Sequence, residues 1–339
     1  MLVEKNVPLQ PFNTFHIVAK AHALARIGSE ADALGLMADP VLREMPKFVL
    51  GGGSNVVLTG DVKPLVLKVE IKGRCLVSET AKTFIVEAGA GENWHDWVVT
   101  ATARGWWGLE NLALIPGTVG AAPLQNIGAY GVELCQRLES VTAWHVAAQK
   151  YVTLSRAECD FGYRDSIFKR AKRGEWLIVS VRFALPKAWQ PVLTYPDLAG
   201  HPQLALGSQA VTAQAVLEAV CDIRRRKLPD PAVLGNAGSF FKNPVVSATQ
   251  YQALQASFAK LVAYPQPEGG VKLAAGWLIE YCGFKGLRSG AVGVHSQQAL
   301  VLVNYGHAQA DELLAFASTI SQAVQKTFGV LLEIEPVIV

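Results

Sequence analysis

The amino-acid sequence predicts an α+β protein of several structural units. Its 339 residues suggest two or three domains, and the 50% that are hydrophobic allow a sizeable core. Helical and strand-like segments alternate near both ends, whereas short β-rich runs dominate the middle of the chain. Together these observations predict three units, at residues 1–70, 71–221 and 222–339.

The individual elements follow from the spacing of apolar residues and from residues that begin or end a helix. Thr212 is suited to cap a helix at its N-terminus, and Gly283 and Gly329 are suited to end one. Helices are predicted at 31–38, 94–103, 212–226, 248–258, 272–282 and 311–328, and strands at 48–50, 56–58, 83–88, 176–185, 299–303 and 330–334.

Composition and charge exclude several classes of function. The 31 basic and 28 acidic residues leave a net charge of +3, which is too balanced for a protein whose main partner is nucleic acid or an acidic membrane. Five widely spaced cysteines without a C-x-x-C motif fit reduced thiols in the cytoplasm, and the N-terminal sequence lacks the apolar core of an export signal. The histidines show no metal-ligand spacing, so we expect no metal site.

The segment from Asn111 to Val132 has no charged residue and is long enough to span a membrane. However, its prolines, amides and glycines would break or expose a helix that faces lipid. We therefore expect no membrane insertion and interpret the segment as a buried loop that contacts a large ligand.

Three consecutive glycines, Gly51 to Gly53, separate two apolar runs and are followed by Ser54 and Asn55. The dinucleotide-binding fingerprint needs a further glycine where Val56 stands, and a strand rather than a helix is expected next, so this motif fails. Backbone N–H groups with no Cβ atoms in the way form a nest that suits a pyrophosphate. The alternative is a tight turn between strands in which Asn55 bonds its own backbone.

A second glycine-rich stretch, "ALIPGTVGAAPLQNIGAYG", covers residues 113–131 and could wrap the other end of one extended cofactor. Together with "GGGSN", "FGYRDSIFK" (161–169) and "GNAGSFFKNP" (235–244), it resembles the UDP-N-acetylenolpyruvoylglucosamine reductase family, also called UDP-N-acetylmuramate dehydrogenase, of bacterial cell-wall synthesis. The resemblance runs from "PFNTF" near the start to "LEIE" near the end, so it covers nearly the whole chain.

The resemblance implies a vanillyl-alcohol-oxidase-like (PCMH-type) FAD-binding fold. Residues 1–70 and 71–221 would form two α/β subdomains that hold FAD non-covalently, and residues 222–339 an α+β domain that binds the UDP-sugar. The family reduces UDP-N-acetylglucosamine enolpyruvate with NADPH as hydride source, and we expect a cytoplasmic monomer. The residues that would hold FAD are Gly51, Gly52, Gly53, Ser54, Asn55, Pro116, Gly117, Thr118, Gly120, Ala121, Asn126, Gly128, Ala129, Tyr130 and Gly131.

The chemistry that the resemblance implies needs a cation, an acid and a further carboxyl group. Hydride adds to the terminal carbon of the enol ether, negative charge moves onto the substrate carboxylate, and the adjacent carbon then takes a proton. Arg164 matches the family's cation, since a guanidinium can clamp a carboxylate with two hydrogen bonds. Ser239 matches its proton donor. Glu335 matches its catalytic glutamate, although the sequence pattern alone does not choose between Glu335 and Glu333.

Further residues match positions that line the UDP-sugar in the family. The substrate-binding residues implied in this way are Tyr163, Tyr195, Lys227, Asn243 and Gln298. Tyr195 places the chain in the branch whose tyrosine loop folds over the substrate. Without the resemblance, Arg164 reads as half of a surface pair with Asp165, and most of the basic cluster Arg224 to Lys227 as solvated charge at a helix end.

The chain departs from the usual family pattern at three places. Gly52 stands where members often carry glutamate, Ala121 and Ala122 stand where pairs of serines are common, and Pro336 follows Glu335 where an apolar strand residue is usual. Two other functions remain compatible with the residues alone. One is an FAD-dependent oxidase or dehydrogenase of the same fold that acts on an alcohol or lactone, and the other is a non-catalytic protein that binds nucleotide sugars.

Overall fold

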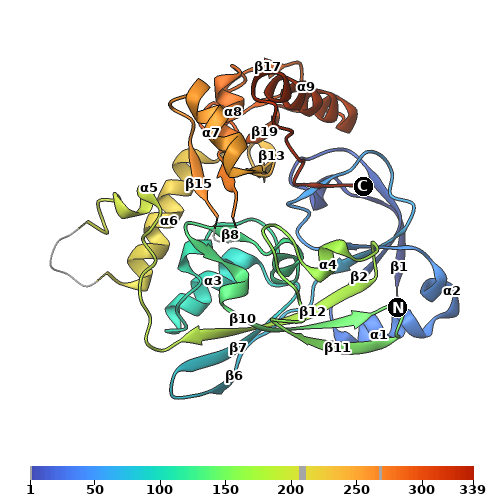
Figure 1. The fold of residues 1–339 in the computed structure, drawn as a ribbon. Coiled ribbons are helices and arrows are strands. Elements are labelled where there is room, and N and C mark those ends of the chain that lie inside the picture. The colour runs from blue at the N-terminus through green and yellow to red at the C-terminus, as the bar shows by residue number, and fades with distance from the viewer. Residues whose placement is uncertain (1, 206–210, 267–268) are drawn as a thin grey trace. The chain divides into compact units, whose positions relative to one another are not determined.

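A computed structural model describes residues 2–205, 211–266 and 269–339 of the chain (Figure 1). The fold divides into two compact units. The first contains the described residues of Met1–Val7, Ala21–Gly52 and Val62–Arg226, and the second those of Pro8–Lys20, Gly53–Asp61 and Lys227–Val339. The N-terminal third of the chain therefore contributes to both units. The finer division at residues 70 and 221 stays a prediction.

One sheet of the first unit is formed near the N-terminus. Its strand order is β1–β2–β5–β3, and both β2 and β3 pair in parallel with β5. The chain crosses from β2 to β3 through two helices, and Ser29 caps the first of them by accepting a hydrogen bond from the Asp32 N–H at 3.1 Å. The bounds are β1 Val3–Pro8, β2 Lys20–Ile27, α1 Glu30–Ala38, α2 Pro40–Glu44, β3 Lys47–Leu50 and β5 Leu65–Val69.

A second sheet of the first unit is antiparallel, in the order β11–β10–β12–β7–β6. The buried rings of Trp94 and Trp97, on helix α3, pack against Phe183 of β12 and join the helix to the sheet. The bounds are β6 Arg74–Glu79, β7 Thr83–Gly89, α3 Trp94–Ala103, β10 Leu138–His145, β11 Lys150–Ser155, α4 Ile167–Arg170, β12 Trp176–Pro186, α5 Pro196–Ala199 and α6 Ala213–Lys227.

The uncharged segment 111–132 folds into short turns rather than one long helix. Its middle part, the 3₁₀ helix η3, lies against β7 and β12. Within the described ranges, no helix is long and apolar enough to cross a membrane. The bounds are η2 Glu110–Leu112, η3 Val119–Gln125, β8 Gly128–Ala129, β9 Val132–Glu133 and η4 Leu134–Gln136.

The second unit contains three small sheets and three α-helices. Their strand orders are β13–β19–β18–β17, β14–β16–β15 and β20–β4. Buried Phe15, Phe240 and Phe241 join the N-terminal segment of this unit to the residues that follow β13. The bounds are η1 Gln10–Phe12, β4 Val56–Val57, β13 Gly235–Ser239, β14 Val245–Val246, α7 Ala248–Ser257, β15 Ala263–Pro265, β16 Val271–Leu273, α8 Ala275–Tyr281, β17 Arg288–Ser289, β18 Val292–Val294, β19 Val301–Asn304, α9 Ala310–Phe328 and β20 Val337–Ile338.

Most predicted elements are confirmed, but two are wrong in part. The helix expected from residue 272 begins only at Ala275, because Lys272 pairs with Val245 and Tyr264 in a three-stranded sheet. The strand expected at 330–334 is absent among the described residues except for one bridge, between Ile334 and Phe241, and the last strand is β20. In both places pairing with distant segments decided the outcome.

Candidate active site

Every site residue that the sequence predicts lies in the described part of the chain, and the two glycine-rich stretches meet in the first unit. A Cβ atom on Gly51 would lie 2.6 Å from Thr118 Oγ1, and one on Gly52 would lie 2.8 Å from Gly117 Cα. Both distances are too short for real contacts, so the backbones can approach this closely only because these residues are glycines. The two stretches therefore lie side by side in the first unit. Their joint binding of one cofactor stays a prediction.

The surroundings of this contact fit an anionic cofactor. Thr118 Oγ1 is buried and has no hydrogen-bond partner in the part of the chain that the structure describes. Lys68 donates a hydrogen bond from Nζ to the Gly51 carbonyl at 2.6 Å, and burial lowers the pKa of its ammonium group. A hydroxyl with unused capacity, a nearby cation and a cradle without Cβ atoms are features that a pyrophosphate would use.

The rest of the glycine turn belongs to the second unit. Gly53 has φ +63°, and a Cβ there would lie 1.9 Å from the Phe12 carbonyl oxygen, so only glycine fits. Asn55 donates from Nδ2 to the Glu335 carbonyl at 3.5 Å, and its own carbonyl accepts the Val337 N–H at 2.9 Å. The end of the turn thus holds the C-terminal segment that carries Glu335.

Seven described non-glycine residues of the first unit adopt positive φ, and four of them belong to the motifs of the predicted site. These four are Leu114 (+59°), Asn126 (+43°), Tyr130 (+48°) and Arg164 (+54°). Such backbone conformations are costly and concentrate at functional sites. His95 holds Leu114 in this conformation by accepting its N–H on Nδ1 at 3.2 Å, and burial lowers the pKa of that imidazole.

Arg164 is the second residue of a two-residue turn that Gly162 and Asp165 close through two backbone hydrogen bonds, of 3.1 and 3.3 Å. Its guanidinium donates to the Gly128 carbonyl at 3.0 Å and lies 5.3 Å from the Tyr163 ring centroid. Asp165 pairs instead with Arg170. The interpretation of Arg164 and Asp165 as a surface ion pair is therefore wrong, because the Arg164 guanidinium donates to the Gly128 carbonyl and the Asp165 carboxylate pairs with Arg170.

Asn126 is 1% exposed, and both the nitrogen and the oxygen of its side-chain amide are hydrogen-bonded to other protein groups. Its Nδ2 donates to Glu133 Oε2 at 2.9 Å and to the Gly162 carbonyl at 3.1 Å, while its Oδ1 accepts the Cys135 N–H at 3.0 Å. The side chain thus anchors the turn that carries Arg164. A direct contact of Asn126 with FAD stays a prediction.

Tyr195, a predicted substrate-binding residue, packs against Tyr130, which is predicted to bind the cofactor. Its ring meets the ring of Tyr130 edge to face at a centroid distance of 5.1 Å, and Tyr195 is 40% exposed. Burial raises the pKa of the Tyr130 hydroxyl, and the Arg224 guanidinium acts against this shift. Burial lowers the pKa of the Arg224 guanidinium, and its Nε is buried with no hydrogen-bond partner in the described ranges. Sequence reasoning missed Arg224, because a basic run at a helix end normally faces water, as Arg225 and Arg226 do here.

The second unit brings Ser239 close to Glu335. Ser239 ends β13 after a bulge at Gly238, which has φ +69°, and the next residue, Phe240, accepts the Glu335 N–H at 2.9 Å. Glu335 is half-buried. Glu333 is exposed and pairs with Lys242. The choice of Glu335 over Glu333 as the catalytic glutamate stays a prediction.

Pro336 is compatible with this arrangement. The hydrogen bonds from the C-terminal segment to β4 come from the N–H groups of Val337 and Val339, at 2.9 Å each, so the missing N–H of the proline costs the ladder nothing.

Two of the predicted substrate residues meet at the start of α8. Asn243 Oδ1 accepts the Ala275 N–H at 2.9 Å, and Gln298 Oε1 lies 3.2 Å from the place where Gly276 would carry a Cβ. Lys227 is the last residue of α6 and is half-buried. Among the described residues, no group of three or more histidine, cysteine, aspartate or glutamate side chains is arranged to hold a metal ion.

Comparison with known proteins agrees with this geometry. Family models match residues 21–154, as an FAD binding domain, and residues 230–339, as the C-terminal domain of UDP-N-acetylenolpyruvoylglucosamine reductase. A solved structure of UDP-N-acetylenolpyruvylglucosamine reductase from Thermus caldophilus superimposes with a TM-score of 0.68, covering 100% of this chain and 99% of that one, and its 24% identity shows the fold alone. The chain therefore has a PCMH-type FAD-binding fold, as the sequence predicts.

Two curated relatives identify the family. The UDP-N-acetylenolpyruvoylglucosamine reductase of Bordetella pertussis is 55% identical over 346 residues, covering 99% of this chain and 97% of its own length. That of Paraburkholderia phymatum is 54% identical, covering 97% and 96%. The chain belongs to the UDP-N-acetylenolpyruvoylglucosamine reductase family.

Proposed function

We propose that this protein is an FAD-containing, NADPH-dependent reductase that converts UDP-N-acetylglucosamine enolpyruvate to UDP-N-acetylmuramate in peptidoglycan synthesis. The observation that carries the proposal is the family membership, which rests on 55% identity along 99% of the chain. The local geometry supports it, because motifs far apart in the sequence meet at Gly52 and Gly117 and again at Ser239 and Glu335.

The cradle formed by Gly51, Gly52 and Thr118, with Lys68 beside it, would hold the pyrophosphate of FAD. When bound, FAD supplies the hydride transfer between NADPH and the enol ether. Gly51 and Gly52 place no Cβ atoms in the cradle, and the buried Thr118 hydroxyl would give a ligand oxygen a donor. Tyr130, in its strained conformation, would line the same site.

Three side chains of this chain would act on the substrate. Arg164 would bind the substrate carboxylate and stabilise the negative charge that develops on it, because its guanidinium can form two parallel hydrogen bonds. Ser239 would give its hydroxyl proton to the carbon next to the one that accepts hydride. Glu335, half-buried and close to Ser239 in the backbone, would be the carboxyl group of the site.

The remaining predicted residues would bind the UDP-sugar. Lys227 would contact the diphosphate, whereas Asn243 and Gln298, which meet at the start of α8, would orient the polar groups of the ligand. Tyr163 and Tyr195 would close over it, with Tyr195 supported by Tyr130.

Anaerobic half-reactions test the proposed activity. We expect purified protein to be yellow, to be bleached by NADPH and to regain its colour when the enolpyruvyl UDP-sugar is added. If only oxygen restores the colour, the substrate assignment fails. Reduction by an alcohol or lactone without NADPH would identify another oxidase of the same fold.

Ser239→Ala tests the proton donor. We expect NADPH to reduce the flavin of this variant at nearly the normal rate, and reoxidation by the UDP-sugar to slow by roughly 10²–10⁴-fold, since only that half-reaction needs the proton. Ser257→Ala, an exposed serine of α7, is the matched control. An equal loss in both half-reactions would assign Ser239 to structure or to NADPH binding instead.

We further propose that the enzyme works in the cytoplasm as a monomer. The structure describes all five cysteines and finds each of them free, which supports a reducing compartment. Analytical ultracentrifugation of the FAD-loaded protein checks the monomer, and a dimer peak at micromolar concentration would refute it.

A further inference from the structure

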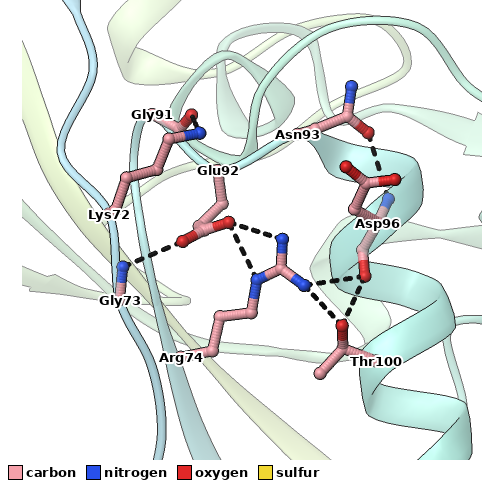
Figure 2. A network of polar contacts seen from close by, with 8 residues as sticks. All are labelled: Lys72, Gly73, Arg74, Gly91, Glu92, Asn93, Asp96 and Thr100. Carbon is pink, nitrogen blue, oxygen red and sulfur yellow. Dashed lines mark hydrogen bonds and ion pairs between the residues drawn. The ribbon is translucent and has the colours of Figure 1, made fainter.

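A buried ion pair lies behind the second glycine-rich stretch. Glu92, in the turn between β7 and α3, is 6% exposed. Its Oε1 accepts the Gly73 N–H at 2.9 Å, and its Oε2 accepts hydrogen bonds from Arg74 Nε at 2.8 Å and Nη2 at 2.6 Å (Figure 2). Such a two-pronged contact fixes the direction of both side chains.

The same arginine also reaches the first turns of α3. Arg74 Nη1 donates to the Asp96 carbonyl at 3.1 Å and to Thr100 Oγ1, as Figure 2 shows. Lys72 donates from Nζ to the Gly91 carbonyl at 2.6 Å. The start of β6, the turn and α3 are therefore tied together by charged side chains, and we call Arg74 and Glu92 the clamp.

The turn that the clamp holds has no room to move toward β6. A Cβ on Gly89 would lie 2.5 Å from the Ile71 carbonyl oxygen, and one on Gly91 would lie 2.3 Å from the carbonyl carbon of Glu70. The Gly91 N–H donates to the Ile71 carbonyl at 2.8 Å. The backbone of residues 89–92 is thus packed directly on the backbone that leads into β6.

The other side of this turn carries the stretch that meets Gly51 and Gly52. The Val119 N–H donates to the carbonyl of Glu92 itself at 2.9 Å. The Gly120 N–H donates to the Ala90 carbonyl at 2.9 Å, and the Trp94 N–H donates to the Gly117 carbonyl at 3.1 Å. Residues 117–120 are therefore aligned on the turn by three backbone hydrogen bonds, one of which goes to the clamp residue.

The charge state of the clamp suits this task. Burial of the Glu92 carboxyl group opposes ionisation, but the Gly73 N–H and the Arg74 guanidinium outweigh it, so its pKa lies below the ordinary value. At neutral pH the clamp is consequently a complete ion pair.

We propose that Arg74 and Glu92 are positioning residues for FAD: through the 89–94 turn they hold Gly117–Gly120 at the spacing from Gly51 and Gly52 that the pyrophosphate requires. The proposal depends on the proposed function in one respect, namely that residues 117–120 bind FAD. It assigns neither residue a contact with FAD or substrate.

The test measures FAD affinity directly. Glu92→Gln keeps the shape of the side chain and removes its charge. We expect the Kd for FAD, measured by flavin fluorescence with the apoprotein, to rise about 10- to 100-fold, the size of losing one hydrogen bond to a charged group. Because the chemistry is untouched, kcat at saturating FAD should stay within about two-fold of wild type.

A matched control separates this role from general stability. Glu87 of the adjacent strand β7 also forms an ion pair, with Arg182 at 2.6 Å, and its side chain is 26% exposed. Glu87→Gln removes a comparable charge without touching the turn, and should leave the Kd for FAD within about two-fold. Melting temperatures of the apoproteins show how far each change destabilises the fold.

Three results would overturn the proposal. The first two are an unchanged Kd for FAD in Glu92→Gln and a rise of the same size in Glu87→Gln. A kcat that stays low at saturating FAD would also overturn it. If Glu92→Gln does not fold, Arg74→Lys, which keeps the charge but loses the fork, is measured in the same way. Since the FAD titrations need no UDP-sugar, an unchanged Kd is distinct from a failure of the wild-type protein to reduce the UDP-sugar.

Discussion

Gly52→Ala tests the close contact between the two glycine-rich stretches. In the structure the added Cβ would lie 2.8 Å from Gly117 Cα, 3.3 Å from the Gly117 carbonyl carbon and 3.6 Å from the Thr118 nitrogen. All three neighbours are backbone atoms, so no side chain can rotate away. The two segments must separate instead.

The size of the effect follows from this geometry. Carbon atoms are in comfortable contact from about 3.5 Å, so the Gly117 backbone must move by roughly 0.7 Å. Overpacking of this kind costs about 1–3 kcal/mol. In the apoprotein, residues 117–118 can shift to relieve the overlap, whereas bound FAD needs the original spacing. Most of the cost should therefore fall on binding, which corresponds to about 5- to 150-fold weaker affinity.

Flavin fluorescence titration of the apoprotein measures this change. Gly35→Ala is the control, because apart from its chain neighbours and the backbone of its own helix no described atom lies within 4 Å of its Cβ position in α1. It should leave the FAD affinity unchanged and stabilise the helix by about 0.5–1 kcal/mol. If Gly52→Ala binds FAD as tightly as wild type, the contact is not rigid and the cradle argument is wrong.

Three further predictions concern side chains. Glu335→Gln should lower the rate of flavin reoxidation by the UDP-sugar by about 10²–10⁴-fold. Glu333→Gln should change this rate less than two-fold, because the Glu333 side chain that pairs with Lys242 is exposed. Stopped-flow traces that show similar effects for the two variants would contradict the assignment. Tyr195→Ala should raise the KM for the UDP-sugar about 3- to 10-fold at unchanged rate of reduction by NADPH, and an unchanged KM would place its loop outside the site. The pKa of Glu92 is depressed in the folded protein, so its ion pair contributes fully above the ordinary value of 4.5 and is lost as the pH falls through the folded pKa. Fluorescence titrations from pH 7 to pH 3 should show this loss of FAD affinity in wild type but not in Glu92→Gln, and parallel curves would refute it.

Much of the fold could be predicted because local signals agreed with the tertiary structure. The helix at 94–103 was expected with the bounds that the structure has, and Gly329 ends α9 with φ +65° as its position indicated. The errors fall where pairing with distant segments outweighs local preference. Lys272 became part of a strand because β14 and β15 lie on either side of it.

The candidate site shows the same division. The linked motifs identified the candidate site residues, because glycines, amides and a single arginine in a fixed order are specific to a family. Spacing along the chain did not reveal which side chains support them. Glu92 and Arg74 lie 18 residues apart in the sequence, and only the packing of Gly89 and Gly91 on the strand entry brings them together.

By itself, then, the sequence determined the family, the glycine turn from Gly51 to Asn55 and the residues available for chemistry. The tertiary structure decided which of them lie close together. Glu335 lies beside the segment that follows Ser239, whereas Glu333 forms an exposed ion pair. The glycine turn packs closely against the backbone of Gly117. The physical reason is that burial and close backbone approach are properties of segments that meet only after folding, and no local pattern encodes them.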